Sequence, residues 1–289
     1  MYKYSIIINS SADLTEEVRK ELDLVLAPLK FTIEGTEYIN YLDYRSLDVK
    51  DFYEQMRSGK VATTSQLNVS EYVELIQKEF DKGKDVLILG FSSALSGTFN
   101  SARIAAELFE DHQQKVYLVD TKAASLGEGL IAYLAAMKRK EGYTIEKLYE
   151  YIEQIKYFVA HWFTVDDLMF LKRGGRLGGA SAVIGSILGI KPILHVDIEG
   201  RLIPMGKVRG RKKALKTLVE KVAETHDPNL PKDVFISHGD DLEAALSVKE
   251  RIEELGLGLK VKLINYVGPV IGAHAGPGTI AVFFFATQR

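Results

Sequence analysis

The chain lacks cysteine altogether, which excludes disulfide bonds and thiolate chemistry from its stability and function. It also lacks an excess of charge of either sign, because 37 Lys and Arg residues face 39 Asp and Glu residues. A near-neutral chain has no overall field that attracts nucleic acid or an anionic membrane surface. We therefore expect no nucleic-acid partner, and a reducing cytoplasm is the expected location.

Long hydrophobic runs are missing as well. One of the longest, residues 280–286, is far shorter than the roughly 20 residues that a membrane-spanning helix needs. Residues 1–9 lack the apolar core and cleavage site of a signal peptide, so we expect a first strand there and no export. Neither an H-E-x-x-H pattern nor a G-x-x-x-x-G-K-[ST] loop occurs, so we expect no zinc cofactor and no kinase activity in the chain itself.

What the chain does contain is a hydrophobic fraction of 46%, enough to fill a sizeable core. Residues 1–160 alternate short apolar strands with amphipathic helices, and apolar runs without alternation are typical of parallel strands covered on both faces. The expected strands there are 6–8, 25–31, 85–91 and 116–119, and the expected helices are 15–22, 51–58, 70–81, 97–109 and 127–141. This predicts an N-terminal α/β/α domain with a mainly parallel sheet.

Residues 161–289 show a different order of expected strands and helices, which predicts a C-terminal α/β domain with a mixed sheet. A hairpin is expected around Glu199-Gly200. Further strands are expected at 158–164, 234–237, 261–266 and 279–286, helices at 180–188, 213–224 and 242–255, and a Gly/Pro-rich loop at 268–278.

Two hydroxyl-rich segments are the most informative local feature. Thr63-Thr64-Ser65-Gln66 and Ser92-Ser93-Ala94-Leu95-Ser96-Gly97-Thr98 both lie next to expected helix starts, and neither carries an ionisable side chain. Hydroxyls and free N–H groups at helix starts suit a small anionic group such as a carboxylate or phosphate. Helix capping is the competing explanation for each serine taken alone, and Ser96 is a good N-cap candidate.

Basic groups and one histidine add to this picture. His274 lies in the Gly/Pro-rich loop, where a histidine can donate a hydrogen bond to an anion or to a neighbouring carbonyl. Residues 172–176 and 207–213 interleave arginines with glycines, which fits a phosphate or an acidic partner surface, although most such runs are solvated faces.

Two other functions compete with anion binding of this kind. Gly90-Phe91-Ser92-Ser93-Ala94 approaches the nucleophile elbow of serine hydrolases but lacks its last glycine, so an acyl-ester hydrolase acting through Ser92 or Ser96 is the main alternative. His238 or His274 could serve as its base. A binder of phosphate or sugar phosphate is the third candidate.

The chain contains, in the same order along its whole length, a series of motifs that resemble those of the DegV proteins. These are the bacterial fatty-acid-binding group that includes the FakB subunits of fatty acid kinases. The motifs that carry the resemblance are Asn9-Ser10-Ser11-Ala12-Asp13-Leu14, Thr63-Thr64-Ser65-Gln66, Ser92 to Thr98, Val165-Asp166-Asp167-Leu168, Arg173-Gly174-Gly175-Arg176, Lys191-Pro192-Ile193-Leu194, Lys207 to Ala214, and Gly268 to Gly278.

The resemblance implies a non-enzymatic carrier that encloses one long-chain fatty acid, such as palmitate, with no further cofactor. It implies that Thr64 and Ser96 hold the carboxylate in a neutral hydroxyl cage. The neighbours that it implies for this network are Thr63, Ser65, the N–H of Gly97, and His274.

In the FakB group a separate ATP-dependent kinase phosphorylates the bound acid. The resemblance assigns Arg173 and Arg209 to that encounter, through docking or acyl-phosphate binding. Three departures from the family pattern concern the head-group region: Leu67 replaces a usual proline, Asn9 replaces a usual aspartate, and Ala273 and Ala275 flank His274 where a threonine is common.

Overall fold

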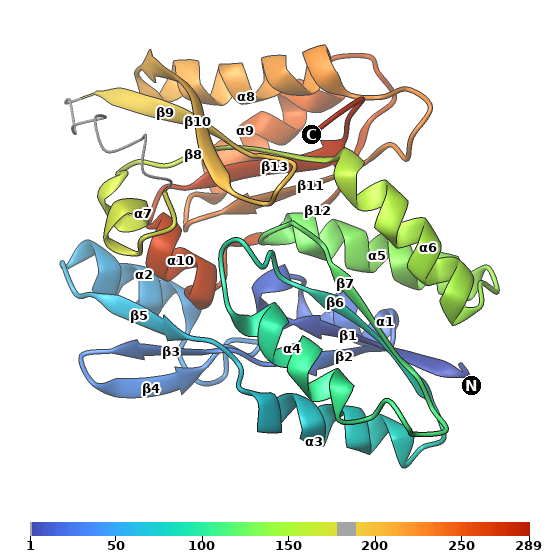
Figure 1. Ribbon diagram of the computed structural model, residues 1–289. Coiled ribbons are helices and arrows are strands. Elements are labelled where there is room, and N and C mark those ends of the chain that lie inside the picture. The colour runs from blue at the N-terminus through green and yellow to red at the C-terminus, as the bar shows by residue number, and fades with distance from the viewer. Residues whose placement is uncertain (1, 178–188) are drawn as a thin grey trace.

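The computed structural model describes residues 2–177 and 189–289, and the helix predicted over 180–188 lies outside them. The chain forms two large sheets with helices between and outside them, together with a small third sheet (Figure 1). This confirms the predicted two-part α/β class with a parallel N-terminal sheet and a mixed C-terminal sheet. In the part of the chain that is described, no helix is both long and apolar enough to cross a membrane.

The first large sheet is fully parallel, with the strand order β2-β1-β6-β7. Its strands are β1 (Tyr4–Asn9), β2 (Leu24–Ala27), β6 (Asp85–Gly90) and β7 (Val116–Asp120). Ile6 and Ile8 face one hydrophobic cluster and Ile7 faces another, so both faces of the sheet are buried. That burial explains why these strands are apolar without alternation.

Helices cover both faces of this sheet. The helices of the N-terminal part are α1 (Glu16–Glu21), α2 (Val49–Arg57), α3 (Val69–Phe80), α4 (Thr98–Glu107), α5 (Leu126–Lys140) and α6 (Ile145–Ile155), with the short 3₁₀ helices η1 (Ser10–Ala12) and η2 (Lys156–Phe158). Helices α3 and α4 pack on one face, and α5 and α6 pack on the other. Helix α6 was not among the predicted elements.

A small antiparallel sheet corrects two predictions. It has the order β4-β3-β5, with β3 (Lys30–Ile33), β4 (Thr36–Ile39) and β5 (Ala62–Ser65). The single strand predicted over 25–31 is instead two strands in different sheets, because Pro28 follows β2 and cannot donate to a ladder. The hydroxyl segment that begins at Thr63 is largely strand β5 rather than a loop.

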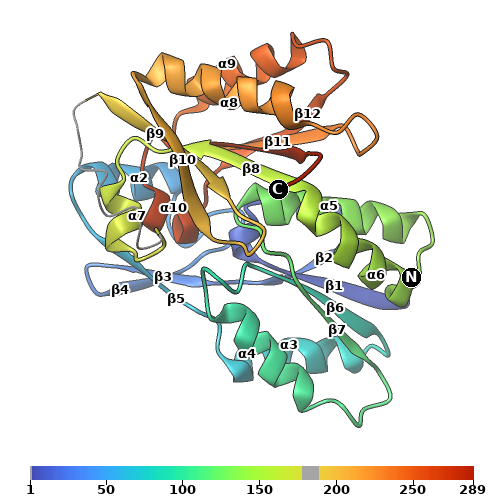
Figure 2. The same cartoon turned by 45° about the horizontal axis from the view of Figure 1, so that its top comes forward.

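The second large sheet is mixed, with the order β10-β9-β8-β13-β11-β12. Its strands are β8 (Val159–Thr164), β9 (Ile190–Val196), β10 (Leu202–Arg209), β11 (Asp233–His238), β12 (Lys260–Tyr266) and β13 (Ile280–Phe285). Strands β9 and β10 pair antiparallel, which confirms the hairpin predicted around Glu199-Gly200. Figure 2 shows α8 (Arg211–Thr225) and α9 (Leu242–Glu253) covering the outer face.

Helix α5 lies between the two large sheets and packs against β6 on one side and against β8, β11 and β13 on the other (Figure 1). Eleven of its residues are buried, which explains its unusually apolar sequence. Since β8 already belongs to the second sheet at Val159, strand pairing changes close to residue 160. The domain boundary at that residue stays a prediction.

Two short helices of the C-terminal part fall where no helix was predicted. Helix α7 (Met169–Arg173) follows β8, and α10 (Pro269–Ala275) occupies most of the predicted Gly/Pro-rich loop. Proline is compatible with the first turn of a helix, where its missing N–H has no partner to lose. Gly276 ends α10 with φ 80°, a conformation that favours glycine.

Candidate functional site

A cavity of about 300 Å³ lies against the second large sheet and beside the N-terminal end of α5. Its apolar wall comes from the second large sheet and from α7 and α10, through side chains that include Leu171, Val196, Leu202, Val270, Ile271, Phe163 and Phe283. Small-molecule sites typically enclose about 300–1,000 Å³ and are mostly apolar with a few polar groups. The cavity fits that description.

The two hydroxyl segments converge on this cavity. Thr64 and Ser65 from β5 and Ser96 and Gly97 from the loop after β6 all line it. The side chain of Gln66 lies so close to Gly97 that a Cβ there would be 2.1 Å from its Oε1 atom. A larger residue at position 97 would therefore displace the Gln66 side chain where the two segments touch.

Ser96 caps only in part. Its hydroxyl oxygen accepts a hydrogen bond from the N–H of Thr98 at 3.2 Å and lies 3.0 Å from the Thr98 hydroxyl. The N-cap position of α4 is Gly97, so the prediction of Ser96 as N-cap is wrong by one residue. Since a hydroxyl has one proton and two lone pairs, Ser96 keeps hydrogen-bonding capacity on the cavity wall.

His274 sits near the end of α10 and joins the hydroxyl segments. Its Nε2 atom is 2.8 Å from the Thr64 hydroxyl oxygen. Burial, and then the charges of Arg176 and Arg173, lower the pKa of His274 to about 4, so the imidazole is neutral at pH 7. If Nε2 carries the proton and donates to Thr64, the threonine proton is free for an anion in the cavity.

Gly174 fixes the other side of this imidazole. A Cβ at Gly174 would lie 2.1 Å from Nδ1 of His274, so the backbone after α7 packs directly on the ring. The buried Nδ1 atom has no hydrogen-bond partner within the described residues.

Arg176 lines the cavity, although it was predicted only as part of the basic segment 172–176 and not as a carboxylate-binding residue. Its Nε donates to the carbonyl oxygen of Leu95 at 3.1 Å, and Nη1 donates to that of Gly174 at 2.5 Å. These bonds hold a partly buried guanidinium on the cavity wall beside the Ser96 loop. The cavity wall beside the hydroxyl segments therefore contains a cation, whereas the resemblance implied a neutral hydroxyl cage.

The other predicted site residues lie further out. Thr63 is exposed and does not line the cavity, although Thr64 and Ser65 of the same strand do. Arg173 is exposed and stacks on Phe170, with its guanidinium carbon 5.1 Å from the ring centre. Arg209 is exposed at the end of β10. The roles assigned to all these residues stay predictions.

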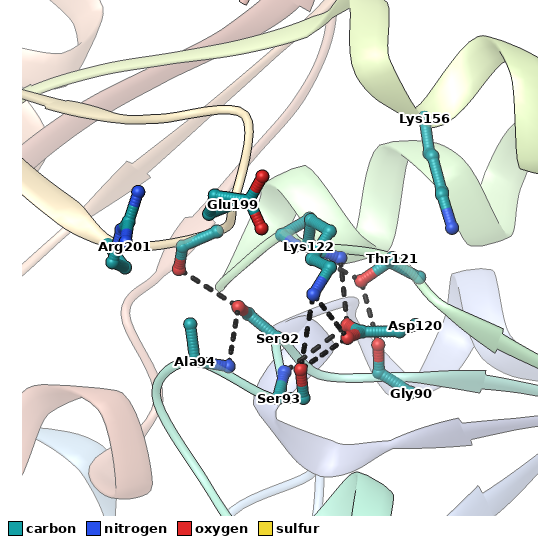
Figure 3. Close-up of polar contacts among 12 residues, drawn as sticks. Gly90, Ser92, Ser93, Ala94, Asp120, Thr121, Lys122, Lys156, Glu199 and Arg201 are labelled. Carbon is teal, nitrogen blue, oxygen red and sulfur yellow. Dashed lines mark hydrogen bonds and ion pairs between the residues drawn. The ribbon is translucent and has the colours of Figure 1, made fainter.

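The serines considered as nucleophiles have partners that do not suit catalysis (Figure 3). Ser92 is fully buried, and its hydroxyl donates to the carbonyl oxygen of Gly200 at 2.9 Å. The hydroxyl of Ser96, the other candidate, lies 3.0 Å from that of Thr98. The neighbouring Ser93, which was not a candidate, donates to Asp120, which also pairs with Lys122 at 2.9 Å. Within residues 2–177 and 189–289, no histidine is a hydrogen-bond partner of Ser92 or Ser96. The geometry thus offers no serine–histidine pair at either position.

Comparison with known proteins places the chain in a family. A family model described as "Uncharacterised protein, DegV family" matches residues 3–287. The chain belongs to the DegV family. A DegV domain-containing protein of Clostridium perfringens is 43% identical over 292 residues, covering 100% of this chain and 99% of the relative.

Solved DegV structures share the fold. The structure titled "Fatty Acid Binding of a DegV family Protein from Thermus thermophilus" has a TM-score of 0.88 at 31% identity, covering 99% of this chain and 100% of that one. The structure titled "Crystal Structure of DegV, a fatty acid binding protein from Bacillus subtilis" has a TM-score of 0.84 at 32% identity, with the same coverage. The resemblance to DegV proteins noted from the motifs is thereby confirmed.

The departures from the DegV pattern are accommodated in different ways. Leu67 and Ala273 are both buried in the hydrophobic cluster that includes residues of α3. Asn9 is also buried and donates through Nδ2 to the hydroxyl of Tyr72 at 2.8 Å. Ala275 lines the cavity, so this departure touches the site itself.

A second polar region of this DegV cavity was not predicted. Ser11, Ser125 and Ser237 line the wall, and the buried carboxyls of Asp13 and Glu128 lie behind them. The signal for it was present, since Glu128 interrupts an otherwise apolar helix start. A charged residue in such a segment needs a buried partner.

Proposed function

We propose that this DegV protein is a carrier of a long-chain fatty acid such as palmitate, and that it works in the cytoplasm. The carboxylate would contact the hydroxyls of Thr64 and Ser96 and the guanidinium of Arg176, while the acyl chain fills the apolar cavity. The observation that carries the proposal is that these polar groups share one cavity with apolar side chains from the second large sheet and from α7 and α10.

The energetics assign different tasks to the two parts of the ligand. A chain of about fourteen methylenes contributes roughly 11 kcal/mol of gross transfer free energy at about 0.8 kcal/mol each. Each hydrogen bond to a charged carboxylate adds about 1.5–3 kcal/mol. The tail would therefore supply most of the affinity, and the hydroxyls would fix the orientation of the carboxylate.

The solved relatives from Thermus thermophilus and Bacillus subtilis, whose titles describe fatty acid binding, support the same ligand class. Their match covers 99% of this chain, so the fold as a whole has a counterpart in them.

Mass spectrometry under denaturing conditions tests the proposal directly. The purified chain should release a long-chain fatty acid, and after delipidation it should bind palmitate. A phosphorylated metabolite as the sole released ligand, or labelling of Ser92 or Ser96 by a fluorophosphonate probe, would contradict the carrier function.

We further propose that the carrier presents its fatty acid to a separate ATP-dependent kinase, as the resemblance to the FakB group implies. Arg173 and Arg209 are exposed cations, and such side chains suit contact with an acidic partner or an acyl phosphate. Incubating the palmitate-loaded protein with ATP and a fatty acid kinase subunit should yield acyl phosphate. Unchanged turnover in an Arg173→Ala, Arg209→Ala double variant would remove both arginines from this role.

A further inference from the structure

The second polar region has no role in holding a carboxylate at Thr64 and Ser96, yet it lines the same cavity. Ser11, Ser125 and Ser237 come from η1, the N-cap of α5 and strand β11, and none is more than 5% exposed. Alternation along β11 places Ser237 on the same face as Phe235, which packs in the cluster around α5. A wall that served only an alkyl chain would carry an apolar side chain at that position.

Ser125 holds its place against a conformational cost. Its backbone has φ 53° and ψ −143°, a region that residues other than glycine rarely adopt and that costs about 1–3 kcal/mol. Its hydroxyl donates to Asp13 at 2.5 Å and lies 3.2 Å from that of Ser237. Strain of this kind persists where the surrounding structure holds the residue in place, and it is concentrated at active sites and ligand sites.

The protons of these hydroxyls are directed by two buried carboxyls. Ser11 donates to Glu128 at 3.2 Å, and Ser125 donates to Asp13, which also accepts from the N–H of Gly268 at 3.1 Å. With both carboxyls ionised, the serine protons point away from the cavity and oxygen lone pairs face it.

Protonation reverses this arrangement. Burial raises the pKa of Asp13 to about 8 and that of Glu128 well above its usual range. A protonated Asp13 donates to Ser125, which then donates to Ser237, so that Ser237 presents its proton to the cavity. An alcohol group satisfies either arrangement, because it both donates and accepts a hydrogen bond.

Helix α10 contacts both polar regions, and its length gives an estimate of their separation. Gly268, at its N-cap, donates to Asp13, and His274, six residues later, contacts Thr64. At about 1.5 Å per helical residue the two points are about 9 Å apart. An extended chain advances about 3.3–3.6 Å over three bonds, so this distance corresponds to roughly seven or eight bonds.

We propose that Ser11, Ser125 and Ser237 form a second polar subsite that takes a hydroxyl group in the middle of the acyl chain. The preferred ligand is then a long-chain fatty acid hydroxylated near its midpoint. The proposal rests on the proposed fatty acid carrier function and specifies its ligand class.

Competition binding on the delipidated full chain tests this inference. The probes are palmitate and hydroxypalmitates with the hydroxyl at the α carbon, near the middle of the chain, or at the ω carbon. A mid-chain isomer should bind about tenfold more tightly than palmitate, the gain that one or two neutral hydrogen bonds provide. The α and ω isomers should show no such gain.

Two variants locate the effect. Ser237→Ala should abolish the preference for the mid-chain isomer, whereas Ser101→Ala, which removes a buried hydroxyl outside the cavity, should retain it. Palmitate binding without preference for any mid-chain isomer in the wild type refutes this inference alone and leaves the carrier function intact. A preference that survives Ser237→Ala refutes the assigned subsite. Failure of the wild type to bind palmitate and every hydroxypalmitate refutes both proposals.

Discussion

Replacing Thr64 with valine tests the head-group assignment most sharply, because valine keeps the branched shape and removes only the hydroxyl. That hydroxyl lies 2.8 Å from Nε2 of His274 and lines the cavity. Losing one hydrogen bond to a charged carboxylate costs about 1.5–3 kcal/mol. Affinity for palmitate should therefore fall by roughly 10- to 150-fold, which isothermal titration calorimetry of the delipidated protein can measure.

Thr63→Val is the matched control. It removes the same group from the preceding residue of β5, which is exposed and does not line the cavity. Affinity in this variant should stay within about twofold of the wild type, the effect of a surface change of at most about 0.5 kcal/mol. Wild-type affinity in Thr64→Val, or an equal loss in both variants, would refute the assignment of Thr64.

Three further predictions concern stability and site geometry. Burial raises the pKa of Asp13 from 3.8 to about 8, so the wild type loses stability as the pH rises from about 4 to about 8. The free energy of unfolding of Asp13→Asn, relative to that of the wild type, should therefore increase across this range. Parallel pH profiles of the two proteins in urea melts would contradict this. Gly200→Ala should cost about 2 kcal/mol or more in thermal melts, because φ is 81° and the Cβ would lie 2.2 Å from the hydroxyl oxygen of a buried serine, whereas Gly206→Ala on the same hairpin has open space and should be nearly neutral. Gly97→Ala should displace Gln66 and weaken palmitate binding several-fold with little loss of stability, since the atom in the way is the end of a flexible side chain; unchanged binding would show that this close approach is irrelevant to the ligand.

Much of the fold could be predicted because its strongest signals are local. The unbroken apolar runs of β1 and β6 and the turn at Glu199-Gly200 depend on residues close in sequence. The small sheet was missed because its strands are short and only partly buried, with two exposed residues in β4 and two in β5. Helix α10 was missed because proline and glycine are typical of loops, although Gly272 is required by close contact with Tyr53.

In the candidate site too, local signals could be read from the sequence and contacts between distant residues could not. Thr64 and Ser96 could be selected from sequence because hydroxyls cluster near helix starts and match a family motif. Arg176 could not be separated from its basic neighbours, since its place depends on bonds to the carbonyls of Leu95 and Gly174. The contact of Ser125 with Ser237 joins residues 112 positions apart, and no local pattern reports such a pairing.

The cavity has a consequence for the lifetime of the protein. Its walls include Phe163 and Phe283, which otherwise belong to the main hydrophobic core. At about 24 cal/mol per Å³, an unfilled space of about 300 Å³ costs on the order of 7 kcal/mol. A cargo that fills this space completes the core and stabilises the fold in proportion to the logarithm of its concentration. The amount of intact protein in a cell would then follow the supply of its cargo, because the empty form is the one that unfolds and is degraded.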